Sequence, residues 1–145
     1  MNRYVERLSP EQWDLFSKNA HKFSFNLDRP ENMNRISFAL LVHDDRAPCC
    51  YMTIIELDKK SVYLQHGGSF PGAVEGGLNQ APAKGYYMII DYLSENYEFA
   101  STKVLNTNQK MLKLHFSAGF IVTGTDTRDG ETFLILSKNM VQNAA

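Results

Sequence analysis

The sequence of 145 residues contains no apolar run close to the roughly 20 residues that a membrane-spanning helix needs. Its first residues, MNRYVERLSP, lack the apolar segment of a secretory signal, so we predict a cytoplasmic protein. A surplus of one charge sign is also missing, because the net charge is −1 and the pI is about 6.4. Without a basic surplus, nucleic-acid binding would need a local patch. The length predicts a single domain over residues 1–145.

Cysteine is scarce, and its placement disfavours two kinds of site. The two cysteines, Cys49 and Cys50, are adjacent. In a strand their side chains would point to opposite faces, which argues against a disulfide between them. Together with His43 they do not form the CxxC pattern of a zinc site. We therefore predict two buried strand residues in a reducing compartment and no metal site.

The sequence does contain strand-like and helix-like patterns, in the order β-α-β-β-β-α-β-α-β-β. Strands are predicted at residues 4–8, 35–43, 49–57, 61–66, 101–105, 120–125 and 132–137, and helices after Ser9 and at residues 82–96 and 108–118. Ser9-Pro10-Glu11-Gln12 has the residues of a capped helix start. Short turns predict that the second, third and fourth strands form an antiparallel meander, and Asp129-Gly130 predicts a hairpin before the last strand.

Residues 67–81, GGSFPGAVEGGLNQA, are rich in glycine and show little periodicity. Such a segment is either a flexible loop or a loop wrapped around a ligand. It separates the meander from the helix predicted at residues 82–96.

The most informative segment is KVLNTNQKMLKLHFSAGF, residues 103–120. It combines the end of a strand, a polar turn in which Asn108 can cap a helix, and apolar residues at helical spacing. Gly119 stands where a helix ends in a left-handed residue, and Phe120 opens the next apolar run.

This segment resembles the Gcn5-related N-acetyltransferases (GNAT), whose typical run is V-x-x-x-N-x-x-A-x-x-x-Y-x-K-x-G-F. With the order of elements, the resemblance covers nearly the whole chain and is strongest over residues 61–137. It implies an α+β fold with a mixed, mostly antiparallel sheet of about six or seven strands flanked by about three or four helices. A second N-terminal helix would have to lie within residues 23–34. It also implies transfer of an acyl group from acetyl-CoA directly to an amine acceptor.

The resemblance also implies where the coenzyme binds. A backbone N–H of the strand 61–66, at Leu64 or Gln65, would polarise the thioester carbonyl. The loop before the next helix would hold the pyrophosphate with its backbone N–H groups and the helix N-terminus. In this chain that stretch offers Gly76, Gly77, Lys84 and Gly85. It departs from the family pattern Q/R-x-x-G-x-G/A, because Gln80 is followed by APAKG. Phosphate binding with another geometry, weakened coenzyme binding and a merely flexible loop all remain open.

Two residues of the segment 103–120 carry chemical expectations. Asn108 matches the family's coenzyme-contacting Asn, and it can equally be a plain helix cap. His115 stands where the family has a Tyr that protonates the departing thiolate. A histidine could act as this general acid, since its ordinary pKa is near 6.5. It could also be a structural residue, in which case Tyr86 or Tyr87 could supply the phenol.

Acylation of an amine also requires a base, because the attacking nitrogen must be neutral. Glu56 and His66, each at the end of a predicted strand, are the candidates, with Glu75 as a weaker third. Alternatively, Glu56 is a solvated charge at the end of its strand and His66 a residue at the edge of a loop, with no catalytic role. Phe23 and Phe25 could line a pocket for the acceptor.

Two other functions stay open. One is a GNAT-shaped binding protein, or one that modifies nucleic acid, phage- or plasmid-borne, without ordinary acetyltransferase activity. The departures at the phosphate loop and at His115 support it. The other is an unrelated α+β dimer with no small ligand. A V-shaped opening between strands 61–66 and 101–105 would argue against the latter. A homodimer is compatible with every one of these functions.

Overall fold

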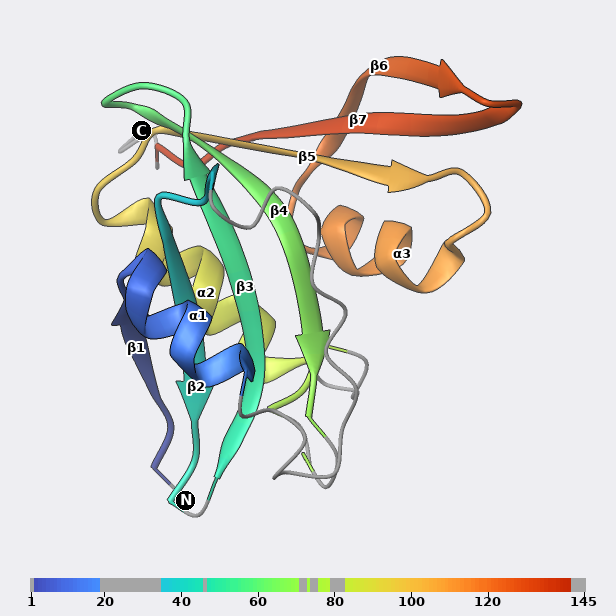
Figure 1. Cartoon of the computed structure of the whole chain (residues 1–145). Helices are drawn as coiled ribbons and strands as arrows, with labels where there is room; N and C mark the ends of the chain where they lie inside the picture. The colour runs from blue at the N-terminus through green and yellow to red at the C-terminus, as the bar shows by residue number, and fades with distance from the viewer. Residues whose placement is uncertain are drawn as a thin grey trace.

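Seven strands form one sheet in the order β1-β2-β3-β4-β5-β7-β6 (Figure 1). The computed structural model describes residues 2–18, 35–45, 47–70, 73, 76–78 and 83–141. The strands are β1 (Tyr4–Leu8), β2 (Phe38–His43), β3 (Pro48–Glu56), β4 (Ser61–Ser69), β5 (Phe99–Leu105), β6 (Ile121–Arg128) and β7 (Glu131–Asn139). The helices are α1 (Pro10–Lys18), α2 (Lys84–Ser94) and α3 (Gln109–Ser117). Among the strands of the described residues, β4 and β5 alone pair in parallel. The predicted mixed, mostly antiparallel α+β fold is thus confirmed, and the helix expected within residues 23–34 lies outside the described residues.

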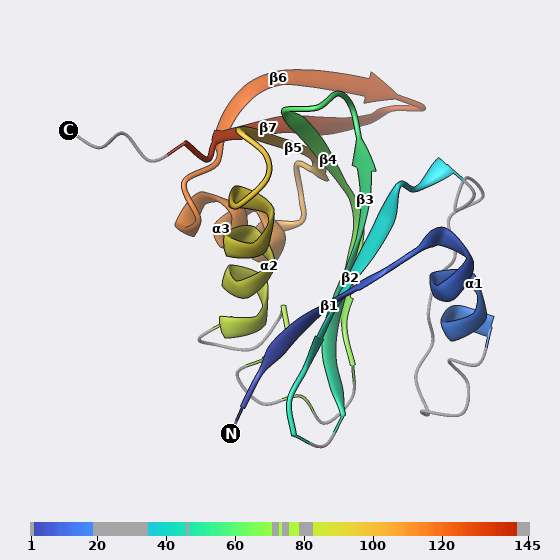
Figure 2. The ribbon, with the colours of Figure 1, turned by 90° about the vertical axis from the view of Figure 1, so that its left-hand side faces the viewer.

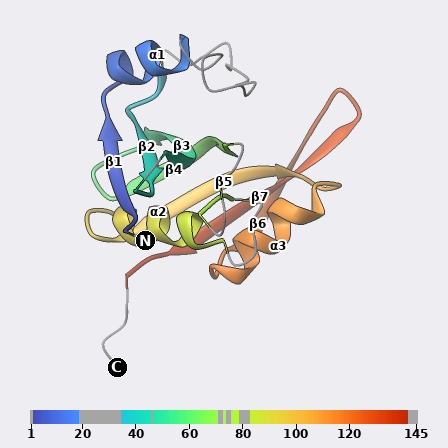
Figure 3. The same ribbon diagram turned by 90° about the horizontal axis from the view of Figure 1, so that it is seen from below.

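The sheet carries a hydrophobic core on each face. Helices α2 and α3 cover one face, and α1 lies on the other (Figures 2 and 3). The larger core joins the sheet to α2 and α3 and includes Tyr86, Ile89 and Leu93 of α2. The smaller core, on the side of α1, contains Trp13 and Tyr51. None of the helices among the described residues is long and apolar enough to span a membrane.

Local signals of the sequence explain several element boundaries. The backbone N–H of Gln12 donates to Ser9 Oγ over 3.2 Å, and Gln12 Oε1 accepts from the Ser9 N–H over 2.8 Å, which confirms the predicted capped start of α1. Between β6 and β7, Asp129 and Gly130 have φ angles of 52° and 80°. Two positive φ angles in succession are the geometry of a tight hairpin turn, as predicted.

The predicted loop over residues 67–81 is wrong at its start, because β4 continues to Ser69. Gly67 and Gly68 pair with Met52 and Tyr51 of β3. A Cβ on either glycine would lie 2.8 Å from the side chain of that partner. Pairing with β3 and close packing therefore outweigh the low strand propensity of glycine.

Cys49 and Cys50 are buried in β3 as free thiols, in agreement with the prediction. Cys50 belongs to the larger core, and burial raises the pKa of its thiol to about 12. A Cβ on Gly76 would lie 2.7 Å from Cys49 Sγ. Both cysteines are thus packing residues.

Candidate active site

The sheet opens between β4 and β5, which pair in parallel. Residues Ser61–Leu64 of β4 pair with Phe99–Thr102 of β5, and the two strands then diverge (Figure 1). At the last point of contact, the Thr102 hydroxyl donates to the Leu64 carbonyl over 2.8 Å. Beyond it, β4 stays paired with β3 and β5 stays paired with β7. Because each strand follows its other neighbour, a V-shaped opening forms, and this argues against the unrelated fold without a ligand.

A β-bulge lies at the mouth of this opening. In the β3–β4 ladder Thr53 is opposite His66 and Ile54 is opposite Leu64, so Gln65 is an extra residue in β4. The extra residue of a bulge is left out of the ladder, and bulges are frequent beside active sites. The buried Thr53 hydroxyl lies 3.1 Å from Gln65 Oε1 and 3.2 Å from the His66 carbonyl oxygen. The bulge therefore leaves Gln65 out of the pairing with β3, next to the point where β5 has left the other side of β4.

A cavity of about 240 Å³ occupies the opening, between β4, β5 and α3. Five residues predicted for the site line it: Leu64, Gln65, His66, Asn108 and His115. The cavity residues that sequence reasoning missed are Met52, Gly67, Thr102, Lys103, Val104, Leu105 and Met111. The parting of two strands has no local sequence signal, so the β5 residues could not be selected from the sequence. Met111 had one signal, its place on the apolar face of the predicted helix.

Asn108 is the N-cap of α3. Its Oδ1 accepts from the backbone N–H of Met111 over 3.3 Å, which confirms the predicted cap. The same residue lines the cavity. The side-chain oxygen thus caps the helix, and this cap does not use the donors of the amide NH₂.

Two variants of Asn108 separate these roles. Asn108→Ala should lower the free energy of unfolding by about 1 kcal/mol, because the Met111 N–H loses its acceptor. Asn108→Asp keeps a capping oxygen and should retain that stability, but it removes the donor and adds a negative charge beside the cavity. Urea unfolding and titration with acetyl-CoA measure the two effects. Equal stability of the Ala variant and the wild type would contradict the capping role.

His115 is buried between α3 and α2. Its Nδ1 lies 2.8 Å from the hydroxyl of Tyr86, and its ring also packs edge-on against Phe120. Burial lowers the pKa of His115 to about 4. At pH 7 about one ring in a thousand would then be the imidazolium, the form that a general acid needs. His115 thus occupies the predicted place with an environment that favours its neutral form.

His66 approaches the cavity from the opposite face of the sheet. Its ring centroid is 5.8 Å from that of Tyr51, a residue of the smaller core on the side of α1. His115 belongs to α3, on the other face. The cavity therefore has one histidine on each side of the plane of the sheet.

Glu56 is not brought to the cavity. It is exposed at the end of β3, opposite Val62, and its Oε2 accepts from the Tyr97 hydroxyl over 2.5 Å. Tyr87 also lies apart, with its hydroxyl 2.6 Å from Ser117 Oγ at the surface. The third candidate base, Glu75, and the predicted acceptor-site residues Phe23 and Phe25 lie outside the described residues.

The four predicted phosphate-binding residues gather at the N-terminus of α2. Gly76 and Gly77 are buried, and a Cβ on Gly85 would lie 1.9 Å from the Gly76 carbonyl oxygen. Close packing therefore explains Gly76 and Gly85 without a ligand. Helix α2 has no side-chain N-cap and no acidic residue in its first turn, and Lys84 is exposed there. Its N-terminus lies toward the same end of the sheet as the end of β4 (Figures 1 and 2), which suits an anion bound beyond the cavity.

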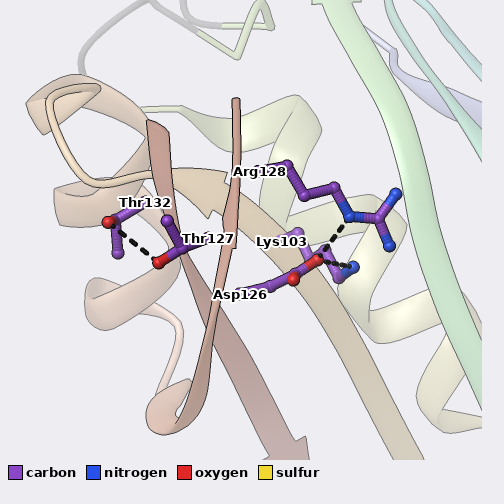
Figure 4. A network of polar contacts seen from close by, with 5 residues as sticks. All are labelled: Lys103, Asp126, Thr127, Arg128 and Thr132. Atoms are coloured by element: carbon purple, nitrogen blue, oxygen red, sulfur yellow. Dashed lines mark hydrogen bonds and ion pairs between the residues drawn. The ribbon is translucent and has the colours of Figure 1, made fainter. Parts of the chain in front are cut away.

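An ion-pair network includes Lys103, a residue of β5 that lines the cavity. Lys103 Nζ lies 2.8 Å from Asp126 Oδ2, which Arg128 Nε also approaches to 3.0 Å (Figure 4). The hydrogen bond from Lys103 lowers the pKa of Asp126. Beside it, the hydroxyls of Thr127 and Thr132 lie 3.2 Å apart across the β6–β7 hairpin. Strand β6 thereby holds the ammonium group of Lys103.

A seven-stranded sheet that parts between its parallel strands, with a bulge on one of them, has the fold of the GNAT acetyltransferases. The chain is similar in structure to the N-acetyltransferase of Staphylococcus aureus Mu50, with a TM-score of 0.68 and 9% identity, covering 98% of this chain and 100% of that one. It is also similar to the ribosomal-protein-S18-alanine N-acetyltransferase of Escherichia coli (TM-score 0.64, 15% identity, 99% and 97% covered). A third similar structure is that of Salmonella typhimurium yncA, a putative acetyltransferase, with its cofactor acetyl-CoA. Its TM-score is 0.63 and its identity 13%, over 99% of this chain and 96% of that one.

No protein-family model matches the sequence, and no curated protein matches it. The resemblance inferred from the sequence is therefore confirmed at the level of the fold.

Proposed function

We propose that the chain is an acyl-CoA-dependent N-acyltransferase, with acetyl-CoA as donor and an amine as acceptor, in which residues 1–145 act as one cytoplasmic domain. The observation that carries the proposal is the cavity at the parting of β4 and β5, with the bulge at Gln65 on its wall. Five residues selected from the sequence for acyl transfer meet there.

The cavity suits the reacting end of the donor. Its volume of about 240 Å³ is below the roughly 300 to 1,000 Å³ of cavities that enclose a drug-sized ligand. It would hold the acyl thioester, while the rest of the coenzyme lies outside it. Gly76, Gly77, Lys84 and Gly85 at the start of α2 would then face the pyrophosphate.

Three positions of the cavity have a role in direct transfer. A backbone N–H at Leu64 or Gln65 donates to the thioester carbonyl oxygen and stabilises its developing charge. His66 accepts the proton of the amine, whose nitrogen forms the bond to the acyl carbon. The carbon–sulfur bond breaks, the electron pair goes to sulfur, and His115 faces that sulfur. Glu56 has no step in this scheme, because it binds Tyr97 outside the cavity.

Thermal unfolding with acetyl-CoA tests the proposal. A ligand that binds only the folded state adds about 2.7 kcal/mol of stability at one hundred times its Kd. We expect Tm to rise with the acetyl-CoA concentration and to rise less with S-acetylpantetheine, which lacks the nucleotide phosphates. Release of free thiol in the presence of a panel of amines would then measure transfer. No shift at millimolar acetyl-CoA would contradict the proposal.

A GNAT-shaped binding protein is the second candidate. The neutral form of His115 and the departure from the family's phosphate loop favour it. It predicts stabilisation by acetyl-CoA without release of thiol for any amine, or no stabilisation at all.

A further inference from the structure

Two tyrosine hydroxyls of α2 bond to α3, and only one of them is buried. Tyr87 and Ser117 meet at the surface over 2.6 Å. Tyr86 is completely buried, and its hydroxyl lies 2.8 Å from Nδ1 of His115, which is 2% exposed and lines the cavity. The two pairs join the same helices, so they form a natural comparison between a bond beside the cavity and a bond away from it.

The burial of Tyr86 decides where the protons lie. Burial raises the pKa of its hydroxyl far above the ordinary value, so Tyr86 keeps its proton. Within the described part of the chain, His115 Nδ1 is the partner of that hydroxyl. If Nδ1 carried a proton, the hydroxyl proton would be buried without an acceptor, which is unfavourable for a buried donor. Tyr86 therefore donates to Nδ1, and the neutral ring carries its own proton on Nε2.

We propose that Tyr86 is a positioning residue that holds His115 in the Nε2–H tautomer, so that the neutral imidazole donates a hydrogen bond to the sulfur leaving the thioester. The Nδ1 edge of the ring faces α2, which leaves the Nε2 edge for the cavity. This step rests on the proposed function. In this step a neutral His115 ring donates a hydrogen bond to the sulfur, in place of an imidazolium that transfers a proton to it.

The step balances without a proton from His115. His66 takes the proton of the attacking amine, and sulfur keeps the electron pair of the broken carbon–sulfur bond. The thiolate accepts the Nε2–H hydrogen bond and takes its proton from water after release. The other titratable groups at the cavity are His66 of β4 and Lys103 of β5, whose ammonium is paired with Asp126.

Nitrogen-15 NMR of the full chain tests the tautomer without reference to any activity. His115 is assigned by the signal that His115→Gln removes. At pH 7 we expect a neutral ring protonated at Nε2. In Tyr86→Phe we expect a mixture of tautomers and a higher pKa of His115, because the bond that favoured the neutral ring is gone. Protonation at Nδ1 in the wild type, or an unchanged spectrum in Tyr86→Phe, would overturn the role of Tyr86.

Steady-state kinetics tests the step at sulfur. A hydrogen bond to a charged atom is worth about 1.5–3 kcal/mol, so His115→Asn, which has no donor at the position of Nε2, should lower kcat about tenfold or more and change KM for acetyl-CoA less than about twofold. Tyr86→Phe should lower kcat in proportion to the fraction of rings that leave the Nε2–H tautomer in the NMR spectrum, with KM unchanged. Tyr87→Phe removes the matched surface bond and should leave kcat unchanged. His115→Gln places an amide N–H near the position of Nε2 and should retain more activity than His115→Asn.

The outcomes separate the two proposals. Equal losses in the Gln and Asn variants would overturn hydrogen bonding by Nε2 while the proposed function stands. Absence of acyl transfer in the wild type would overturn the proposed function and the step at sulfur together. The NMR measurement would then still decide whether Tyr86 holds the tautomer of His115.

Discussion

Replacing Gly85 by alanine should lower the free energy of unfolding by about 3 kcal/mol, at the upper end of the usual cost of overpacking. The new Cβ would lie 1.9 Å from the Gly76 carbonyl oxygen and 2.8 Å from Cys50 Sγ. The first of these atoms is backbone, so α2 and the segment at Gly76 must move apart. Alanine favours a helix over glycine by about 1 kcal/mol, and the clash must outweigh that gain. Urea unfolding followed by circular dichroism measures the change.

Gly124→Ala is the matched control. A Cβ at Gly124 would meet only the Ile135 side chain, at 3.4 Å, which is ordinary van der Waals contact. We expect stability equal to the wild type or higher by up to about 1 kcal/mol, because alanine reduces the freedom of the unfolded chain. A Gly85→Ala protein as stable as Gly124→Ala would show that α2 does not pack against Gly76 as described. Acetyl-CoA should also stabilise Gly85→Ala less than the wild type if this region binds phosphate.

Deleting Gln65 should reduce acyl transfer by about 10²–10³-fold, the usual effect of losing one oxyanion donor. The deletion removes the extra residue of the bulge and leaves the pairs Thr53–His66 and Ile54–Leu64 in register. The ladder between β3 and β4 becomes regular, and no core side chain changes face. We therefore expect the free energy of unfolding to change by about 1 kcal/mol or less. Single-turnover transfer from acetyl-CoA and urea unfolding measure the two quantities.

Gln65→Ala controls for the side chain. It keeps the bulge and removes only the contact between Gln65 Oε1 and the Thr53 hydroxyl. It should lose much less activity than the deletion, within about tenfold of the wild type. If both variants lost the same activity, the side chain of Gln65 and not the bulge would matter, and the backbone donor would have to lie elsewhere.

Local signals in the sequence predict most of the fold. Strand-like apolar runs between turn residues place all seven strands, the Ser9–Gln12 pair starts α1, and Asn108 starts α3, because each depends on contacts between near neighbours in sequence. The predicted end of β4 at His66 was wrong, because Gly67 and Gly68 pair with β3 in spite of their low strand propensity. Such pairing between distant segments decides the outcome against local propensity.

The site was predictable only in part, for the same reason. Leu64, Gln65, His66, Asn108 and His115 were found through a family pattern, and the structure brings them to one cavity. Hydrogen bonds between residues distant in sequence were not predicted. Tyr97 bonds to Glu56 from 41 positions away, and Tyr86 bonds to His115 from 29 positions away. The first contact holds Glu56 outside the cavity and the second occupies Nδ1 of His115, and neither has a sequence signal of its own.

The parting of β4 and β5 gives the sheet four edges in place of two. Strands β1 and β6 are its outer edges, and beyond Leu64 and Thr102 the facing sides of β4 and β5 are inner edges. An outer edge is open to any protein strand that approaches it, which is the usual route to aggregation through sheets. The inner edges of the described strands face each other across the cavity with α3 beside it, so each is less open to an approaching strand than an outer edge is. An extended ligand that is narrow enough to enter between them can still use their backbone donors and acceptors.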